Sequence, residues 1–155
     1  GLTAPRVSTY PQAATLEIRD PIETAKQVVA ELKTKCNFVI ALTHIGYDLD
    51  IQLAEAIPSI DAIIGGDSHT WVPYPTAVKT GKPVEPCWWI GGPIVCQDGE
   101  WGKCLGRLDL AMRKDVSGQY LVERYQSKLI NINSSIKPAD DIEQIINTAA
   151  KSLKN

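Results

Sequence analysis

Apolar positions in the first half of the chain follow two different patterns. Within residues 20–33, five of them recur at helical spacing and form one stripe: Ile22, Ala25, Val28, Val29 and Leu32. Asp20 and Pro21 suit the N-cap and the first position of such a helix. A short continuous apolar run follows over residues 37–44, which is typical of a strand buried on both faces. The pattern therefore predicts a helix followed by a buried strand.

The next segment repeats this order. Asp50 is expected to cap a short helix over residues 51–57, which Pro58 ends. A second buried strand is predicted over residues 60–66. Strand, helix and strand with short connections are the signature of a parallel βαβ unit. Residues 2–3 are expected to end an earlier strand, so the predicted fold class is α/β.

Beyond residue 70 the pattern changes. Residues 71–93 are rich in proline and glycine and are predicted to form a long irregular loop. Three strand-like pieces follow: "PIVCQ", "CLGRLDLAM" and "QYLVERYQSKLINI". The alternation in the last two is typical of antiparallel strands with one solvated face, and "RKDVSGQ" between them suits a hairpin turn. A final amphipathic helix is predicted from about residue 139 to residue 153.

Composition limits the possible functions. The 155 residues are 44% hydrophobic and 22% charged, with a formal net charge of −2 and a pI of about 5.7. This balance argues against a general nucleic-acid or membrane-surface binder, so no nucleic-acid polymer is expected as a partner. No apolar run approaches the ~20 residues of a transmembrane helix. The length suits one domain or part of a larger one.

The cysteines do not decide between an oxidising and a reducing compartment. Cys36, Cys87, Cys96 and Cys104 include no C-x-x-C pair, so zinc-finger spacing is absent. One or two disulfides are possible in an oxidising compartment, and buried free thiols are the alternative. The sequon at Asn133 favours secretion slightly.

Both histidines follow predicted parallel strands. His44 ends the first, and Asp67 and His69 come directly after the second. Open α/β sheets place ligand sites beyond the carboxyl ends of their strands, and a right-handed crossover makes these two strands neighbours. A lone histidine there would more often be a hydrogen-bonded loop residue, but the combination favours a site for zinc, manganese or iron. Gly65 and Gly66 are expected to allow a sharp bend and the approach of a ligand.

Other candidates are weaker. Asp48 and Asp50 could support His44, although a helix cap is the favoured role for Asp50. Ser68 is not expected to be a nucleophile, because both histidines would be bound to metal and no base would remain. The tryptophans could stack on a substrate, while core or loop-anchoring roles are more frequent for this residue. They are Trp71, Trp88, Trp89 and Trp101.

The stretches "THIGYDLD" and "GGDSHT" stand at the ends of the two predicted parallel strands. They resemble the L-T/G-H-x-G-x-x-x-D and G-G-H-S/T-x-T segments of the 5'-nucleotidase family of the calcineurin-like metallophosphoesterases. "GLTAP", "PIVCQDGEWGKCLGRLDL" and "INSSIKPADDIEQII" match further family segments in order, so the resemblance covers essentially the whole chain. It implies part of a four-layer α/β/β/α sandwich with mixed sheets, and a secreted, periplasmic or cell-surface location.

The resemblance also implies a chemistry. Enzymes of this kind hydrolyse phosphate esters of nucleotides with two divalent metal ions, here most suitably zinc or manganese. His44 and Asp67 would bind one ion, and His69 would contact the other. Family members often have histidine where this chain has Asp67. The substitution keeps a good ligand but adds negative charge near a phosphate. Catalytic and substrate-binding residues are not assigned.

The family's other ligands do not occur here. Its D-x-H, G-D-x-x-D and G-N-H-E/D segments are absent from these 155 residues, as is a nucleotide-binding domain. Residues 1–155 are therefore predicted to be the second half of a catalytic domain whose remaining ligands come from outside this chain. The isolated chain is predicted to be inactive. The alternative is a non-catalytic fragment or divergent homologue that serves as a binding module.

Overall fold

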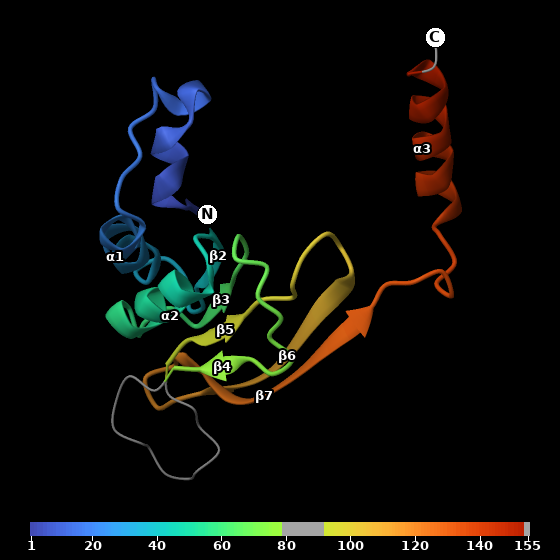
Figure 1. The fold of residues 1–155 in the computed structure, drawn as a ribbon. Coiled ribbons are helices and arrows are strands. Elements are labelled where there is room, and N and C mark those ends of the chain that lie inside the picture. The colour runs from blue at the N-terminus through green and yellow to red at the C-terminus, as the bar shows by residue number, and fades with distance from the viewer. Residues whose placement is uncertain (79–91, 154–155) are drawn as a thin grey trace.

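The computed structural model describes residues 1–78 and 92–153 of the chain and shows mixed α/β architecture (Figure 1). Within these ranges one sheet has five strands in the order β1-β2-β3-β5-β4, and a second has the two strands β6 and β7. The elements are β1 (Leu2–Thr3), the short 3-10 helices η1 (Pro5–Thr9) and η2 (Pro11–Ala13), α1 (Pro21–Leu32), β2 (Ile40–His44), α2 (Tyr47–Ala56), β3 (Ala62–Ile64), β4 (Thr76–Ala77), β5 (Ile94–Cys96), β6 (Cys104–Lys114), β7 (Tyr120–Asn131) and α3 (Asp140–Ser152).

The predicted βαβ unit is confirmed. β2 and β3 pair in parallel with Ile40 opposite Ala62 and Leu42 opposite Ile64, and α2 forms the crossover between them. β1 pairs in parallel on the other side of β2, and β5 pairs in parallel on the other side of β3. The carboxyl ends of four neighbouring strands therefore meet at one edge of the sheet.

The first helix begins as its sequence predicts. The Asp20 carboxylate accepts a hydrogen bond of 2.9 Å from the backbone N–H of Glu23, and Pro21 occupies the first helical position. α2 differs from its prediction, because it begins at Tyr47 with Gly46 as N-cap. Asp50 as a helix cap is therefore wrong: it lies within the first turn of α2 and points into the protein.

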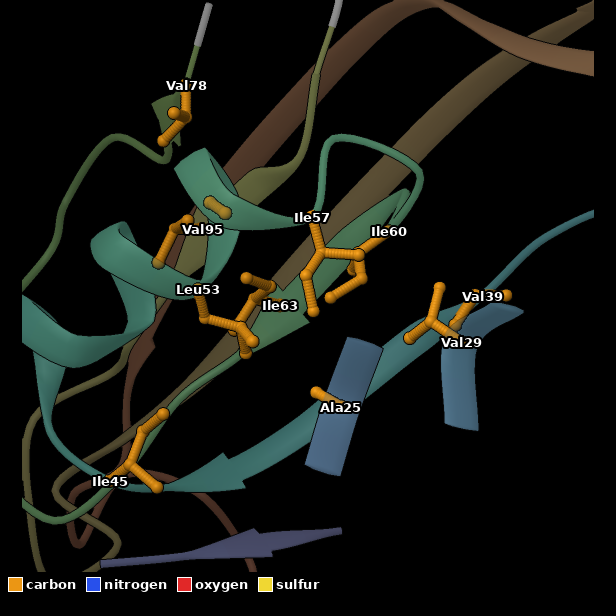
Figure 2. Close-up of a cluster of buried hydrophobic side chains, with 11 residues drawn as sticks. Ala25, Val29, Val39, Ile45, Leu53, Ile57, Ile60, Ile63, Val78 and Val95 are labelled. Atoms are coloured by element: carbon orange, nitrogen blue, oxygen red, sulfur yellow. The ribbon is translucent and has the colours of Figure 1, made fainter. Parts of the chain in front are cut away.

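The core lies between the sheet and the two helices α1 and α2. Figure 2 shows this core cluster, to which α1 contributes Ala25 and Val29, α2 contributes Leu53, the position after α2 contributes Ile57, and the sheet contributes Ile63. The other face of β2 is open in this chain, since Ile40 and Leu42 are 59% and 65% exposed. The prediction of a strand buried on both faces is therefore wrong for β2 here, because the helices cover only one face.

The second half forms the predicted hairpin. β6 and β7 pair in antiparallel fashion, and in the turn between them the Asp115 carboxylate accepts backbone hydrogen bonds from Ser117 (2.8 Å) and Gln119 (2.9 Å). The helix predicted at the end is present as α3. Figure 1 shows it standing apart from the sheet beyond β7. The apolar stripe of α3, Ile142, Ile145 and Ile146, is exposed, and so is Leu153 at its C-cap.

Two predictions for the middle of the chain change. Residues 71–93 were predicted to be irregular, but Thr76 and Ala77 form β4, antiparallel to β5. The three described cysteines, Cys36, Cys96 and Cys104, are free thiols. Cys87, Trp88 and Trp89 lie outside the described residues. No helix in the described ranges is long and apolar enough to cross a membrane.

Leu53→Ala tests the core between α2 and the sheet. Leu53 is completely buried, so its truncation should lower the free energy of unfolding by about 2–5 kcal/mol. Denaturant unfolding of the full-length protein measures the loss. Val116→Ala, at a fully exposed hairpin position, is the control and should stay within about 0.5 kcal/mol. A loss below about 1 kcal/mol for Leu53→Ala would contradict the proposed packing.

Candidate metal centre

The pairing of β2 with β3 places His44 beside Asp67. His44 is the last residue of β2, and Asp67 follows β3 after two glycines. The Nε2 atom of His44 lies 3.3 Å from Oδ1 of Asp67. The His44 ring is largely exposed, whereas the Asp67 side chain is only 9% exposed. An imidazole nitrogen and a carboxylate oxygen thus converge at the sheet edge.

This pair fits one divalent ion. Two donor atoms of a tetrahedral ion with bonds of about 2.0–2.1 Å lie about 3.3 Å apart, and the His44–Asp67 separation has this value. Nitrogen and oxygen donors suit zinc and manganese. Two donors do not complete a coordination sphere. Within the described ranges no group of three or more His, Cys, Asp or Glu side chains is placed to hold an ion.

Arg6 contacts the same carboxylate. Its guanidinium, from η1, donates a hydrogen bond to Oδ1 of Asp67. Arg6 is exposed while Asp67 is nearly buried, so the ion pair lies at the rim of the site. The positive charge of Arg6 offsets the negative charge of Asp67. Sequence reasoning missed Arg6, because no motif marked it.

His69 lies apart from this pair and has a partner of its own. Its Nδ1 atom is 2.9 Å from Oε2 of Glu100, and Lys103 also contacts Glu100. This contact engages one ring nitrogen of His69 and leaves Nε2 available to a metal, and a carboxylate beside the second ring nitrogen is usual for metal-binding histidines. The exposed indole of Trp101 lies against the His69 ring, with centroids 5.6 Å apart. Sequence reasoning did not single out Glu100.

The loop after β3 has an unusual backbone. Asp67 and His69 have positive φ values of 85° and 56°, a left-handed conformation that costs non-glycine residues energy. The backbone bends at Asp67 and Ser68, whereas Gly65 and Gly66 have no such φ. They are needed for space: a Cβ atom on Gly65 would lie 2.1 Å from Asp50, and one on Gly66 would lie 3.2 Å from Nδ1 of His44.

Polar side chains hold this loop. Gln97, which follows β5 and is almost fully buried, donates through Nε2 to the carbonyl of Gly66 (3.1 Å). Its Oε1 accepts from Ser68 Oγ (3.0 Å) and from the backbone N–H of Thr70. Ser68 Oγ also accepts from the N–H of Tyr47 at the start of α2 (3.0 Å). These bonds hold the loop in its strained conformation, so Ser68 has a structural role here.

Asp50 is the buried acid beneath the site. Its Oδ1 accepts a hydrogen bond of 2.6 Å from the Thr43 hydroxyl. Burial raises the pKa of Asp50 from 3.8 to about 6, and the bond from Thr43 opposes that rise. The sequence pattern did not reveal this buried role for Asp50, because a carboxylate before an apolar run is also the usual N-cap pattern.

Curated proteins that resemble the chain include a nucleotide phosphoesterase and a 5'-nucleotidase. The trifunctional nucleotide phosphoesterase YfkN of Bacillus subtilis is 29% identical over 99% of the chain. A 5'-nucleotidase of Vibrio cholerae is 31% identical over 86% of the chain, and the protein UshA of Yersinia enterocolitica is 32% identical over 84%. The chain spans 10% of the first relative and 27% of each of the others. No family model matches the chain.

Solved structures agree with the fold. The 5'-nucleotidase precursor of Thermus thermophilus superposes on 88% of the chain with a TM-score of 0.67 and 27% identity, and the chain covers 27% of it. The calcineurin-like phosphoesterase YfkN of B. subtilis superposes on 98% of the chain with a TM-score of 0.74 at 22% identity, and the chain covers 51% of it. The predicted α/β class with a mixed sheet is confirmed.

The chain is therefore similar in sequence to a segment of 5'-nucleotidases and nucleotide phosphoesterases, as its motifs predicted. The similarity covers a segment of these longer proteins. The two groups that sequence reasoning selected, His44 and the pair Asp67 and His69, lie at the carboxyl edge of the sheet.

The stability of the protein should depend on pH through Asp50. The folded protein binds the Asp50 proton more tightly than the unfolded chain, because burial raises its pKa from 3.8 to about 6. Stability should therefore fall as pH rises from about 4 to about 6, by about 3 kcal/mol in total, and then level off.

Asp50→Asn isolates this effect. As pH rises from about 4 to 7, wild type should lose about 3 kcal/mol of unfolding free energy relative to Asp50→Asn. Denaturant titration of both full-length proteins across this range measures the difference. Glu55→Gln removes an exposed acid from the same helix and is the control. A difference that stays constant with pH for Asp50→Asn would contradict the raised pKa.

Proposed function

We propose that this chain is part of a metal-dependent phosphate-ester hydrolase that acts on nucleotides, of the 5'-nucleotidase kind. The observation that carries the proposal is the 3.3 Å approach of His44 Nε2 and Asp67 Oδ1 at the carboxyl edge of the sheet. It occurs in a chain whose relatives are 5'-nucleotidases and nucleotide phosphoesterases. The substrate class would be a nucleotide or another small phosphate ester.

The proposed ligands divide between two ions, zinc or manganese. His44 and Asp67 would hold one ion, and His69 would contact the other through Nε2, because its Nδ1 is engaged by Glu100. When bound, two such ions stabilise the charge on phosphate oxygens and activate a water for in-line attack. The remaining ligands would come from a part of the enzyme outside these 155 residues.

The chain's own residues prepare this edge of the sheet. Arg6 neutralises part of the charge on Asp67, so the carboxylate opposes an anionic phosphate less strongly. Glu100 fixes the orientation of the His69 ring, and Gln97 holds the loop between the two proposed ligand positions. Trp101 is exposed beside His69 and offers an aromatic surface at the rim.

The proposal extends to the organisation of the enzyme, and the small share of the relatives that the chain covers supports it. Residues 1–155 would form the C-terminal half of a metallophosphoesterase catalytic domain. The upstream half and a nucleotide-binding domain would belong to the same enzyme, which would be secreted, periplasmic or on the cell surface. The exposed apolar side chains of β2 are consistent with a covering layer from the rest of the enzyme. The isolated chain would be inactive.

A non-catalytic binding module is the second candidate. Two observations favour it: Arg6 occupies the carboxylate of Asp67, and the described residues include no group of three potential ligands around one ion. The two candidates differ in what removal of metal does to the full-length protein.

Phosphatase assays of the full-length protein on nucleoside monophosphates test the proposal. Chelation should abolish hydrolysis, and zinc or manganese should restore it. His44→Ala should lower kcat/KM at least about 100-fold, because it removes a ligand of the proposed centre. Hydrolysis that survives both chelation and His44→Ala would exclude the two-metal mechanism. Absence of any activity in the metal-loaded wild type would favour the binding module.

Glu100 provides a separate test of the His69 assignment. Glu100→Ala should weaken metal binding by the full-length protein about 10- to 100-fold, since the His69 ring loses the carboxylate that contacts Nδ1. Glu100→Gln can still accept from Nδ1 and should lose much less. Calorimetric titration with Mn²⁺ measures both, and Glu55→Gln is the exposed control. Equal affinity in Glu100→Ala and wild type would show that His69 does not bind metal through this arrangement.

A further inference from the structure

Asp50 is an ionisable residue at a fully buried position of α2. It lies on the inward face of α2 with 0% of its surface exposed, near apolar neighbours such as Leu53 and Ala54. Charged groups are rarely buried in this way without a specific partner. A residue such as leucine would suit this face of the helix for packing alone. The carboxyl group must therefore be explained by the particular atoms that it contacts.

The first contact is with the end of β2. Oδ1 of Asp50 accepts a 2.6 Å hydrogen bond from the hydroxyl of Thr43. Thr43 immediately precedes His44, and its hydroxyl also lies 3.4 Å from the carbonyl of Ile64 at the end of β3. The bond therefore joins α2 to the strand residue that positions the His44 backbone, at the point where β2 and β3 both end.

The second contact is with the segment after β3. Oδ2 of Asp50 lies so close to Gly65 that a Cβ atom there would be 2.1 Å away, and glycine is the residue that fits. Gly65 donates its N–H to the carbonyl of Cys96 at 2.8 Å, so it cannot easily move away from the carboxyl group. Gly66 and Asp67 follow directly. Oδ2 has no hydrogen-bond partner among the described residues, so its contact with Gly65 is one of shape.

We propose that Asp50 is a positioning residue of the metal centre, and that its carboxyl group sets the spacing between His44 and Asp67 by contacting Thr43 and Gly65 together. The inference rests on the proposed function for its effect on metal binding. Its structural part stands on the contacts of Asp50 alone. One side chain from the crossover helix would in this way control both strand ends that present the ligands.

Shape and the hydrogen bond would carry this role, so charge would not be required. Asp50→Ala in the full-length protein should weaken Mn²⁺ binding about 10- to 100-fold, as the loss of groups that orient ligands typically does. Asp50→Asn keeps both contacts and should restore most of the affinity. Glu55→Gln, on the exposed side of α2, is the matched control. A core residue without a positioning role would change thermal stability in Asp50→Ala and leave the metal affinity of the folded protein unchanged.

The contact between Asp50 and Gly65 can be tested by comparing a double variant with the single variants. Gly65→Ala alone should weaken Mn²⁺ binding, because its methyl group would collide with Oδ2 of Asp50. In the double variant with Asp50→Ala the methyl group can take the space that Oδ2 leaves. The double variant should therefore bind Mn²⁺ at least as tightly as Gly65→Ala alone. Losses that simply add would overturn the proposed contact.

Thr43→Val provides a milder test should Asp50→Ala fail to fold. It removes the hydroxyl donor with little change of shape and should weaken Mn²⁺ binding several-fold. Hydrogen–deuterium exchange of residues 43–46 and 65–70 gives a readout independent of metal. Exchange in both segments should rise in Asp50→Ala or Thr43→Val and stay at the wild-type level in Glu55→Gln. Unchanged exchange would overturn the inference.

These measurements separate the two proposals. Wild-type protein that binds no Mn²⁺ would refute the proposed function, while the exchange data would still decide the role of Asp50. Wild-type protein that binds Mn²⁺, together with Asp50→Ala that binds it equally well, would refute the positioning role alone.

Discussion

The parallel pairing of β2 with β3 is the constraint on which the site depends. Because both strands run in the same direction, their carboxyl ends meet, and residues more than twenty positions apart in the chain become neighbours. The pairing is held from one side by the buried core around Ile63 and Leu53. The register places the end of β2 beside the segment after β3, and the approach of His44 to Asp67 follows from it.

The loop after β3 has a strained backbone, and hydrogen bonds stabilise it. Left-handed residues such as Asp67 and His69 each cost of order 1–3 kcal/mol. The bonds from Gln97 and Ser68 to the loop and to the start of α2 offset this cost. Gln97 comes from the end of β5, so a third parallel strand supports the ligands that the first two present. The loop is therefore supported by three strands and a helix, which limits its motion.

Much of this arrangement could be predicted, for identifiable reasons. The periodicity of residues 20–33 and the apolar runs on either side of α2 are local signals, and they predicted α1, β2 and β3. The rule for carboxyl ends then selected His44, Asp67 and His69. Arg6 and Glu100 could not be found in this way, because each acts through a contact with a residue more than thirty positions away. Asp50 was misjudged because its pattern before "IQLAEAI" is the same for a cap and for a buried acid.

The positive φ of Asp67 has a consequence for how the position can vary. Among residues with side chains, asparagine, aspartate and histidine enter the left-handed region most readily. Aspartate and histidine are also common ligands of zinc and manganese. A chain that must satisfy both demands has few choices, and these two residues meet both. An exchange of Asp67 for histidine is thus one that the backbone permits, and the aspartate of this chain has Arg6 beside it to balance its charge.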